Sequence, residues 1–130
     1  MVREVMSPSV ISVESSATVR DAAQVMIERE IGSVIVTESG RPVGIMTERD
    51  VLRRVVVKGL DPTKTRVGEV MSSPLVTVKA DAYITDAGRL MSERNIRRLL
   101  VVEDDRPVGV VTEKDLLRAF NKYLTVGLRV

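Results

Sequence analysis

Two short stretches of the chain carry side chains that could bind a small polar ligand. Thr47 and Asp50 stand three residues apart, and Thr112 and Asp115 repeat this Thr-Glu-x-Asp pattern. Each pattern links an apolar run to a helical one, which places it at a helix N-terminus, where free amides favour a phosphate. Each aspartate is suited to accept protons from both vicinal hydroxyls of a ribose. The same spacing also fits a helix cap, in which the side chains only satisfy backbone amides, and the two roles can coexist.

Other kinds of chemistry lack their usual side chains. The chain has no Cys and no His, which removes disulfides, thiolate nucleophiles and the commonest general base and metal ligand. Asp50 and Asp115 belong to separate patterns rather than to one acid–base pair, and no nucleophile adjoins a base. We therefore expect a protein that is not an enzyme and holds neither a catalytic cofactor nor a metal.

The two stretches belong to an internal repeat with an offset of 65 residues. Residues 5–54 and 70–119 align without a gap and share 22 identities in 50 positions. The motif Val-Met-Ser recurs at 5–7 and 70–72, and Arg-Pro-Val-Gly recurs at 41–44 and 106–109. Such self-similarity indicates two copies of one supersecondary unit.

Each copy predicts the element order β-α-β-β-α, so the fold class is mixed α/β (α+β). Apolar residues at helical spacing predict amphipathic helices from Val19 to Met26 and from Ile84 to Met91. Thr18 fits a cap for the first of these helices, whereas Tyr83 at the equivalent position does not. The predicted strands are 10–13, 34–36 and 43–46, then 75–78, 99–102 and 108–111, and the closing helices run from 48 to about 57 and from 113 to about 123.

A unit of about 50 residues can scarcely bury its own apolar face, so the two copies are expected to pair about a pseudo-two-fold axis. We expect a first repeat over 1–58, a linker over 59–66, a second repeat over 67–123 and an apolar tail over 124–130 that packs on its own domain or on a partner. The sequence shows neither an apolar run of membrane-spanning length nor a signal peptide, which predicts a cytoplasmic protein without a membrane segment.

With its two Val-Met-Ser motifs, two hairpins and two Pro-Val-Gly-x-x-Thr-Glu-x-Asp runs, the chain resembles a tandem pair of CBS (cystathionine-β-synthase-type) domains over nearly its whole length. The resemblance implies two clefts between the copies that commonly hold adenosine-containing ligands. It matches the family's phosphate and ribose contacts to Thr47 and Asp50 in one cleft and to Thr112 and Asp115 in the other.

Further candidates follow from the same resemblance. Arg49 and Lys114 match a position beside each aspartate that often contributes to binding, and Ser12 and Thr77 match the part of a cleft that holds the base. Arg97 and Arg98 match a place for cationic phosphate contacts, whereas the first copy has the neutral residues Gly32 and Ser33 there, of which Ser33 is a candidate ligand contact. We therefore predict two unequal sites. The ordinary alternatives are strand residues for Ser12 and Thr77 and solvated charges for the two arginines.

The resemblance favours a regulatory module that binds AMP, ADP or ATP, or alternatively S-adenosylmethionine or NAD, and acts on a protein that the sequence does not name. A homodimer is expected because such pairs commonly associate through their helices. A ligand-free dimerisation scaffold is the alternative. A nucleic-acid-binding protein is disfavoured by a net charge of only +2 and by a set of three aromatic residues, which offers little stacking surface.

Overall fold

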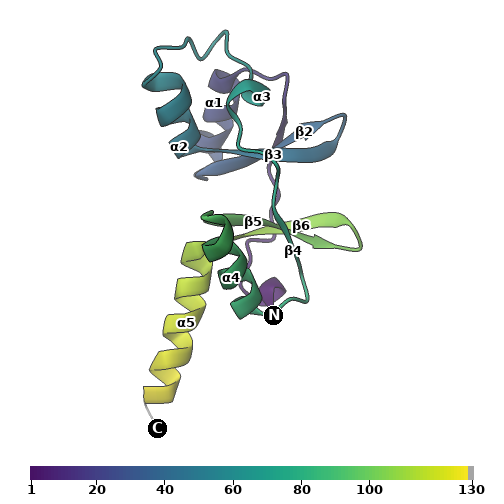
Figure 1. The fold of residues 1–130 in the computed structure, drawn as a ribbon, viewed down its shortest axis with the longest axis vertical. Coiled ribbons are helices and arrows are strands. Elements are labelled where there is room, and N and C mark those ends of the chain that lie inside the picture. Colours follow the sequence, from purple (N-terminus) through teal and green to yellow (C-terminus); the bar gives the residue numbers. More distant parts are fainter. Residues whose placement is uncertain (129–130) are drawn as a thin grey trace. The chain divides into compact units, whose positions relative to one another are not determined.

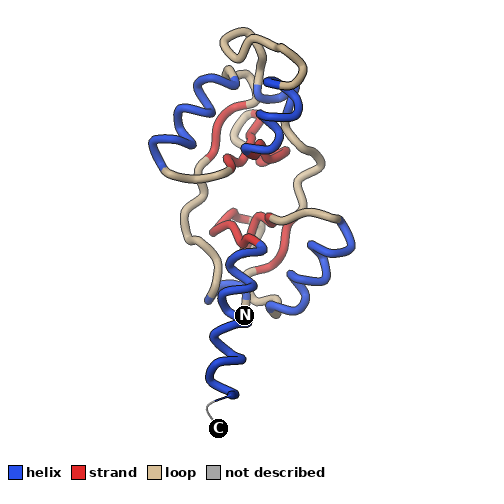
Figure 2. Tube along the Cα trace, turned by 90° about the vertical axis from the view of Figure 1, so that its left-hand side faces the viewer, coloured by secondary structure: helices blue, strands red, loops and turns tan. Residues whose placement is uncertain are grey.

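The computed structural model describes residues 1–128 and divides into two compact units. Unit 2 is the continuous segment Ile11–Leu75, and unit 1 combines Met1–Val10 with the chain from Val76 onward. Each unit consists of a three-stranded sheet with its helices over one face (Figures 1 and 2). The mixed α+β fold class predicted from the sequence is confirmed.

Unit 2 builds its sheet in the order β1-β2-β3, with β1 parallel to β2 and β2 antiparallel to β3. The hairpin expected from the sequence is therefore confirmed. Its elements are β1 (Ser12–Glu14), α1 (Val19–Arg29), β2 (Ser33–Glu38), β3 (Arg41–Thr47), α2 (Glu48–Val51), the π-helix η2 (Leu52–Val56) and α3 (Val67–Val70).

Unit 1 repeats this arrangement with the sheet order β4-β5-β6 and the same strand directions. Its elements are the 3-10 helix η1 (Val2–Glu4), β4 (Thr77–Lys79), α4 (Ile84–Arg94), β5 (Arg98–Glu103), β6 (Arg106–Thr112) and α5 (Glu113–Leu128). The equivalent registers, Ser33 opposite Thr47 and Arg98 opposite Thr112, show that the sequence repeat is also a repeat of strand pairing.

The amphipathic helices form where the apolar spacing predicts them, and their inward residues are buried. In α1 the side chain of Thr18 accepts a hydrogen bond from the Asp21 amide at 3.2 Å, as its position at the cap predicts. In α4 the Tyr83 side chain makes no cap, and its amide instead donates to Asp86 at 3.1 Å. Unit 2 buries Val19, Ala22, Met26, Val34, Val36, Met46, Val55, Val67 and Val70, and unit 1 buries Val2, Val78, Ala80, Ala87, Met91, Leu99, Val101 and Val111.

The two Val-Met-Ser motifs pack against the hairpins of the opposite repeats. Ser72, from the second repeat, exchanges backbone hydrogen bonds of 2.8 and 3.0 Å with Ile45 in unit 2. Ser7, from the first repeat, exchanges bonds of 2.9 and 3.0 Å with Val110 in unit 1. The adjoining glycines admit these segments: a Cβ on Gly44 would lie 2.7 Å from the sulfur of Met71, and one on Gly109 would lie 2.6 Å from that of Met6.

The closing helices differ from the sequence prediction. The first has only one α-helical segment, α2, before it widens into η2, and Gly59 follows with a φ of +68°. The second continues to Leu128, so the part of the predicted tail at 124–128 belongs to α5 and only residues 129–130 lie outside the described chain.

The short helices η1 and α3 have no counterpart in the sequence prediction. None of the helices described is long and apolar enough to cross a bilayer.

Candidate functional site

The first Thr-Glu-x-Asp pattern forms the turn from β3 into α2. The amide of Thr47 donates to Oδ2 of Asp50 at 2.9 Å, and the amide of Asp50 donates to Oγ1 of Thr47 at 3.2 Å. The hydroxyl of Thr47 lies 3.2 Å from the same Oδ2 and donates to it. These reciprocal bonds are a capping box. The cap that the spacing predicted is therefore present, with an aspartate in the place where a glutamate is common.

Two further side chains reach the carboxylate of Asp50. The hydroxyl of Ser72 donates to Oδ1 at 3.0 Å, and Nε of Arg54 lies 4.0 Å from the same oxygen. The guanidinium of Arg54 also donates to the carbonyls of Val70 and Met71 at 3.0 and 2.8 Å. With these partners the Asp50 side chain is only 10% exposed, and the burial of its charge is compensated by hydrogen bonds.

The second pattern forms the turn from β6 into α5 with fewer contacts. The amide of Thr112 donates to Oδ2 of Asp115 at 2.9 Å, and the amide of Asp115 donates to Oγ1 of Thr112 at 3.2 Å. Oδ1 lies 3.8 Å from Nη1 of Arg118, whose side chain is 78% exposed. The Asp115 side chain is 16% exposed, so the second carboxylate is somewhat more accessible than the first.

Strand register gathers polar candidates beside each turn. Ser33 lies opposite Thr47 in unit 2, and the half-buried Arg98 lies opposite Thr112 in unit 1. The carbonyl of Arg97 accepts a hydrogen bond from the first amide of α5 at 2.9 Å, so Arg97 also adjoins the second turn. Its guanidinium is exposed and lies 4.0 Å from the carboxylate of Glu113. The two cations predicted from the sequence thus lie at the second turn only.

The first strands bring the remaining polar candidates to the same sheet faces. Ser12 lies opposite Ile35, two residues along β2 from Ser33, and Thr77 lies opposite Leu100, two residues along β5 from Arg98. Because strand side chains alternate between faces, these positions share the face opposite the helix-covered core residues Val34, Val36, Leu99 and Val101. Ser12 and Thr77 are exposed, as are Arg49 and Lys114 beside the aspartates.

Sequence reasoning missed Ser72 and Arg54 as neighbours of the first turn. Ser72 belongs to a repeated motif, which was a usable signal, although the motif does not show which hairpin it meets. Arg54 has no such signal because Ala119 stands at its equivalent position. Neither residue was among the candidates, yet both contact the carboxylate of Asp50 or lie within ion-pair distance of it.

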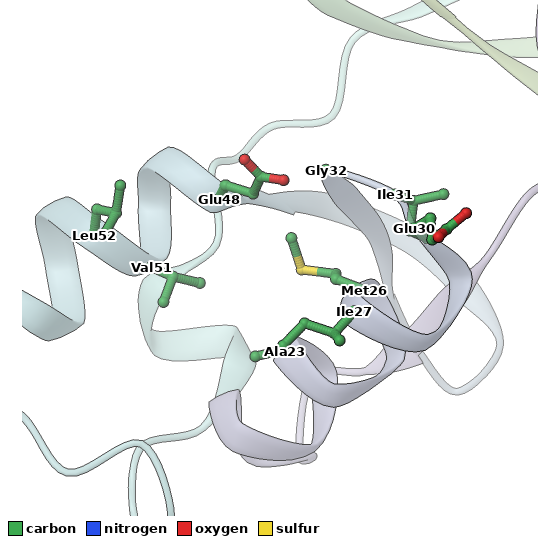
Figure 3. Close-up of a pocket in the computed structure, with 9 residues that line it drawn as sticks. All are labelled: Ala23, Met26, Ile27, Glu30, Ile31, Gly32, Glu48, Val51 and Leu52. Carbon is green, nitrogen blue, oxygen red and sulfur yellow. The ribbon is translucent and has the colours of Figure 1, made fainter.

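A separate groove of about 520 Å³ lies between α1 and α2 (Figure 3). Met26, Ile27 and Leu52 give it an apolar lining, and Ile27 and Leu52 are 72% and 58% exposed. Thr47 and Asp50 do not line it. The residues that the structure describes contain no cluster of three or more acidic side chains that could hold a metal ion.

Comparison with known proteins agrees with the duplicated architecture. The family model described as CBS domain matches residues 2–57 and again residues 67–122. An uncharacterized protein of Methanopyrus kandleri is 40% identical over 119 residues, which are 90% of this chain and 61% of that protein. The CBS domain-containing protein YhcV of Bacillus subtilis is 36% identical over 115 residues, which cover 88% of this chain and 81% of its own. Neither name denotes an enzyme.

Solved structures share the fold. An uncharacterized conserved protein from Pyrococcus horikoshii superposes with a TM-score of 0.83 at 32% identity, covering 91% of this chain and 89% of that one. A hexameric CBS-CP12 protein from bloom-forming cyanobacteria gives a TM-score of 0.82 at 33% identity and covers 88% of this chain and 68% of that one. With two matched copies, two equivalent sheets and two equivalent Thr-Glu-x-Asp turns, the chain belongs to the CBS-domain family as a tandem pair.

Proposed function

We propose that the chain binds an adenosine-containing ligand at its two Thr-Glu-x-Asp turns and thereby regulates a partner protein. CBS-domain pairs serve generally as regulatory, ligand-binding modules. The observation that carries the proposal is the duplicated turn itself, in which Asp50 and Asp115 are capped by Thr47 and Thr112, and these threonines lie on the sheet faces that also carry Ser12, Ser33 and Thr77. AMP, ADP and ATP are the favoured ligands, with S-adenosylmethionine and NAD as alternatives.

Each group has a role in this proposal. The carboxylates of Asp50 and Asp115 accept protons from the vicinal hydroxyls of ribose. Thr47 and Thr112 stand beside the phosphate, with Arg49 and Lys114 as nearby cations, and the hydroxyl of Thr47 keeps its hydrogen bond to Asp50. Arg97 and Arg98 add positive charge at the second turn alone, which favours a ligand with more phosphates there. The cap bonds support the proposal because they hold each aspartate in place before a ligand arrives.

Self-association is part of the same proposal. The apolar groove between α1 and α2, with the exposed side chains of Ile27 and Leu52 beside it, favours contact with another protein surface. One structural neighbour is hexameric by its name. A ligand-free scaffold would use this groove without any ligand at Asp50 or Asp115, so binding measurements separate the two functions.

Thermal unfolding with added ligands tests the proposal. We expect one of AMP, ADP, ATP, NAD and S-adenosylmethionine to raise the melting temperature of the wild type by several degrees, since a ligand at 100 times its Kd stabilises by about 2.7 kcal/mol. The Asp50→Ala, Asp115→Ala double variant should lose this shift. Thr18→Ala is the matched control, because it removes the cap of helix α1, which belongs to neither turn, and should keep the shift. Equal shifts in the double variant and the wild type would contradict the proposal.

A further inference from the structure

The two turns share their backbone hydrogen bonds but differ at the second oxygen of each aspartate. Oδ1 of Asp50 accepts from the hydroxyl of Ser72 at 3.0 Å, with Arg54 at 4.0 Å. Oδ1 of Asp115 lies 3.8 Å from Nη1 of Arg118, and among the side chains that the structure describes no hydroxyl donates to it. The first carboxylate thus has a hydrogen bond that the second lacks.

The difference originates in the helix after each turn. Arg54 donates to the carbonyls of Val70 and Met71, which fixes the backbone immediately before Ser72. At the equivalent position of the second copy stands Ala119, whose methyl group cannot make such bonds. Ser7, the equivalent of Ser72, keeps its backbone pairing with Val110, but its side chain is exposed. Identical Val-Met-Ser motifs therefore have different roles in the two units.

We propose that the hydroxyl of Ser72 competes with the ligand for Oδ1 of Asp50. The first turn therefore binds the ligand more weakly than the second, where Oδ1 of Asp115 has no such competitor. This inference rests on the proposed function. A ribose diol binds a carboxylate by donating protons to its oxygens. At Asp50, Oδ2 already accepts from the amide and hydroxyl of Thr47 and Oδ1 accepts from Ser72, so three of about four acceptor positions are filled. A diol that donates both of its protons therefore has to displace the Ser72 hydroxyl from Oδ1. At Asp115 no hydroxyl has to leave.

The competitor also gives the first turn a regulatory output. Ser72 lies in the segment that ends unit 2 at Leu75 and continues into β4 of unit 1. A ligand that displaces its hydroxyl removes one of the attachments of this connecting segment, whereas a ligand at Asp115 displaces no equivalent bond. Ligand binding at Asp50 therefore loosens the segment that leads from Ser72 into β4. Ligand binding at Asp115 leaves that segment unchanged.

Calorimetric titration with AMP and with ATP tests this inference when each turn is measured alone. Asp115→Asn leaves only the first turn with its aspartate, and adding Ser72→Ala should raise affinity about tenfold, the equivalent of about 1.4 kcal/mol for one charge-assisted hydrogen bond. Asp50→Asn leaves only the second turn, and adding Ser7→Ala is the matched control, with unchanged affinity expected. A purely structural role for Ser72 predicts a lower melting temperature with no gain in affinity.

Each result decides a different proposal. If the Asp115→Asn chain binds nucleotide with equal or lower affinity after Ser72→Ala, the competitor role is wrong while the proposed function stands. A chain that binds only once Ser72→Ala has been added supports the competitor role directly. If neither nucleotide binds the wild type or any variant, the proposed function is wrong and this inference falls with it.

Discussion

Alanine at Gly109 would place a methyl group where the leading segment of the chain crosses the β5-β6 hairpin. Its Cβ would overlap the carbonyl oxygen of Ser7 and lie 2.6 Å from the sulfur of Met6. The methionine side chain can turn away, but the carbonyl is held by the 3.0 Å hydrogen bond from the Val110 amide. The segment must therefore move and weaken both of its backbone bonds to β6.

The expected cost combines overpacking with the loss of these bonds. Overpacking contributes about 1–3 kcal/mol and each of the two net hydrogen bonds about 1 kcal/mol, so Gly109→Ala should destabilise the protein by about 3–5 kcal/mol. At about 4 °C per kcal/mol for a domain of this size, the melting temperature falls by about 12–20 °C. Amide hydrogen exchange should show faster exchange at Ser7 and Val110, because their mutual hydrogen bonds are the ones that weaken.

Gly88→Ala is the matched control for this substitution. Its new Cβ would lie 3.8 Å from Leu116, an ordinary contact, and alanine is favoured over glycine inside helix α4 by up to about 1 kcal/mol. Its melting temperature should stay level or rise. A Gly109→Ala variant that melts with the wild type and keeps its Ser7 amide protected would refute the steric argument.

Two further predictions concern unit 2. Arg54→Ala removes the donor to Val70 and Met71 and should lower stability by about 1–2 kcal/mol in urea unfolding, whereas Arg53→Ala, with no such acceptors, should change it little. Hydrogen bonds from the side chain and amide of Thr63 lower the pKa of Asp61 below its usual 3.8. The ionised carboxylate therefore stabilises the fold above pH 3.8, and this stabilisation is lost as the pH falls through the lowered pKa. Asp61→Asn should therefore have a lower melting temperature than the wild type at pH 7, and the two should melt together in strong acid. A difference in melting temperature that persists in strong acid would show that the Asp61 carboxylate is not its cause.

Much of the fold is predictable because its signals are local and occur twice. The apolar spacing from Val19 to Met26 predicts α1, and Thr18 and Tyr83 predict which of the two equivalent helices has a side-chain cap. The Thr47–Asp50 spacing likewise predicts the cap bonds that the structure contains. Signals of this kind depend on residues a few positions apart, so a single sequence is enough to find them.

The packing of each Val-Met-Ser motif against the hairpin of the opposite repeat is not predictable in the same way. Met6 and Met71 stand in identical Val-Met-Ser motifs, and Gly44 and Gly109 stand in identical Arg-Pro-Val-Gly runs, so the sequence does not show which motif meets which hairpin. The contact of Ser72 with Asp50 depends on that packing of the motif against the opposite hairpin and was missed for the same reason. The ligand roles of the candidate residues stay predictions until binding is measured.

Because the segment Met1–Val10 belongs to unit 1, the division of the chain also sets the order in which the two units can form during synthesis. Unit 2 is one continuous stretch, Ile11–Leu75, so all of its residues are available before the second sheet has been made. Unit 1 needs Met1–Val10 to meet strands that begin at Thr77, beyond the 65 residues of unit 2, and closing a flexible loop of that length costs about 3.7 kcal/mol in chain entropy. A folded unit 2 shortens this loop by holding its ends together. The half of the molecule that contains the chain's first residues is therefore the half that is completed last.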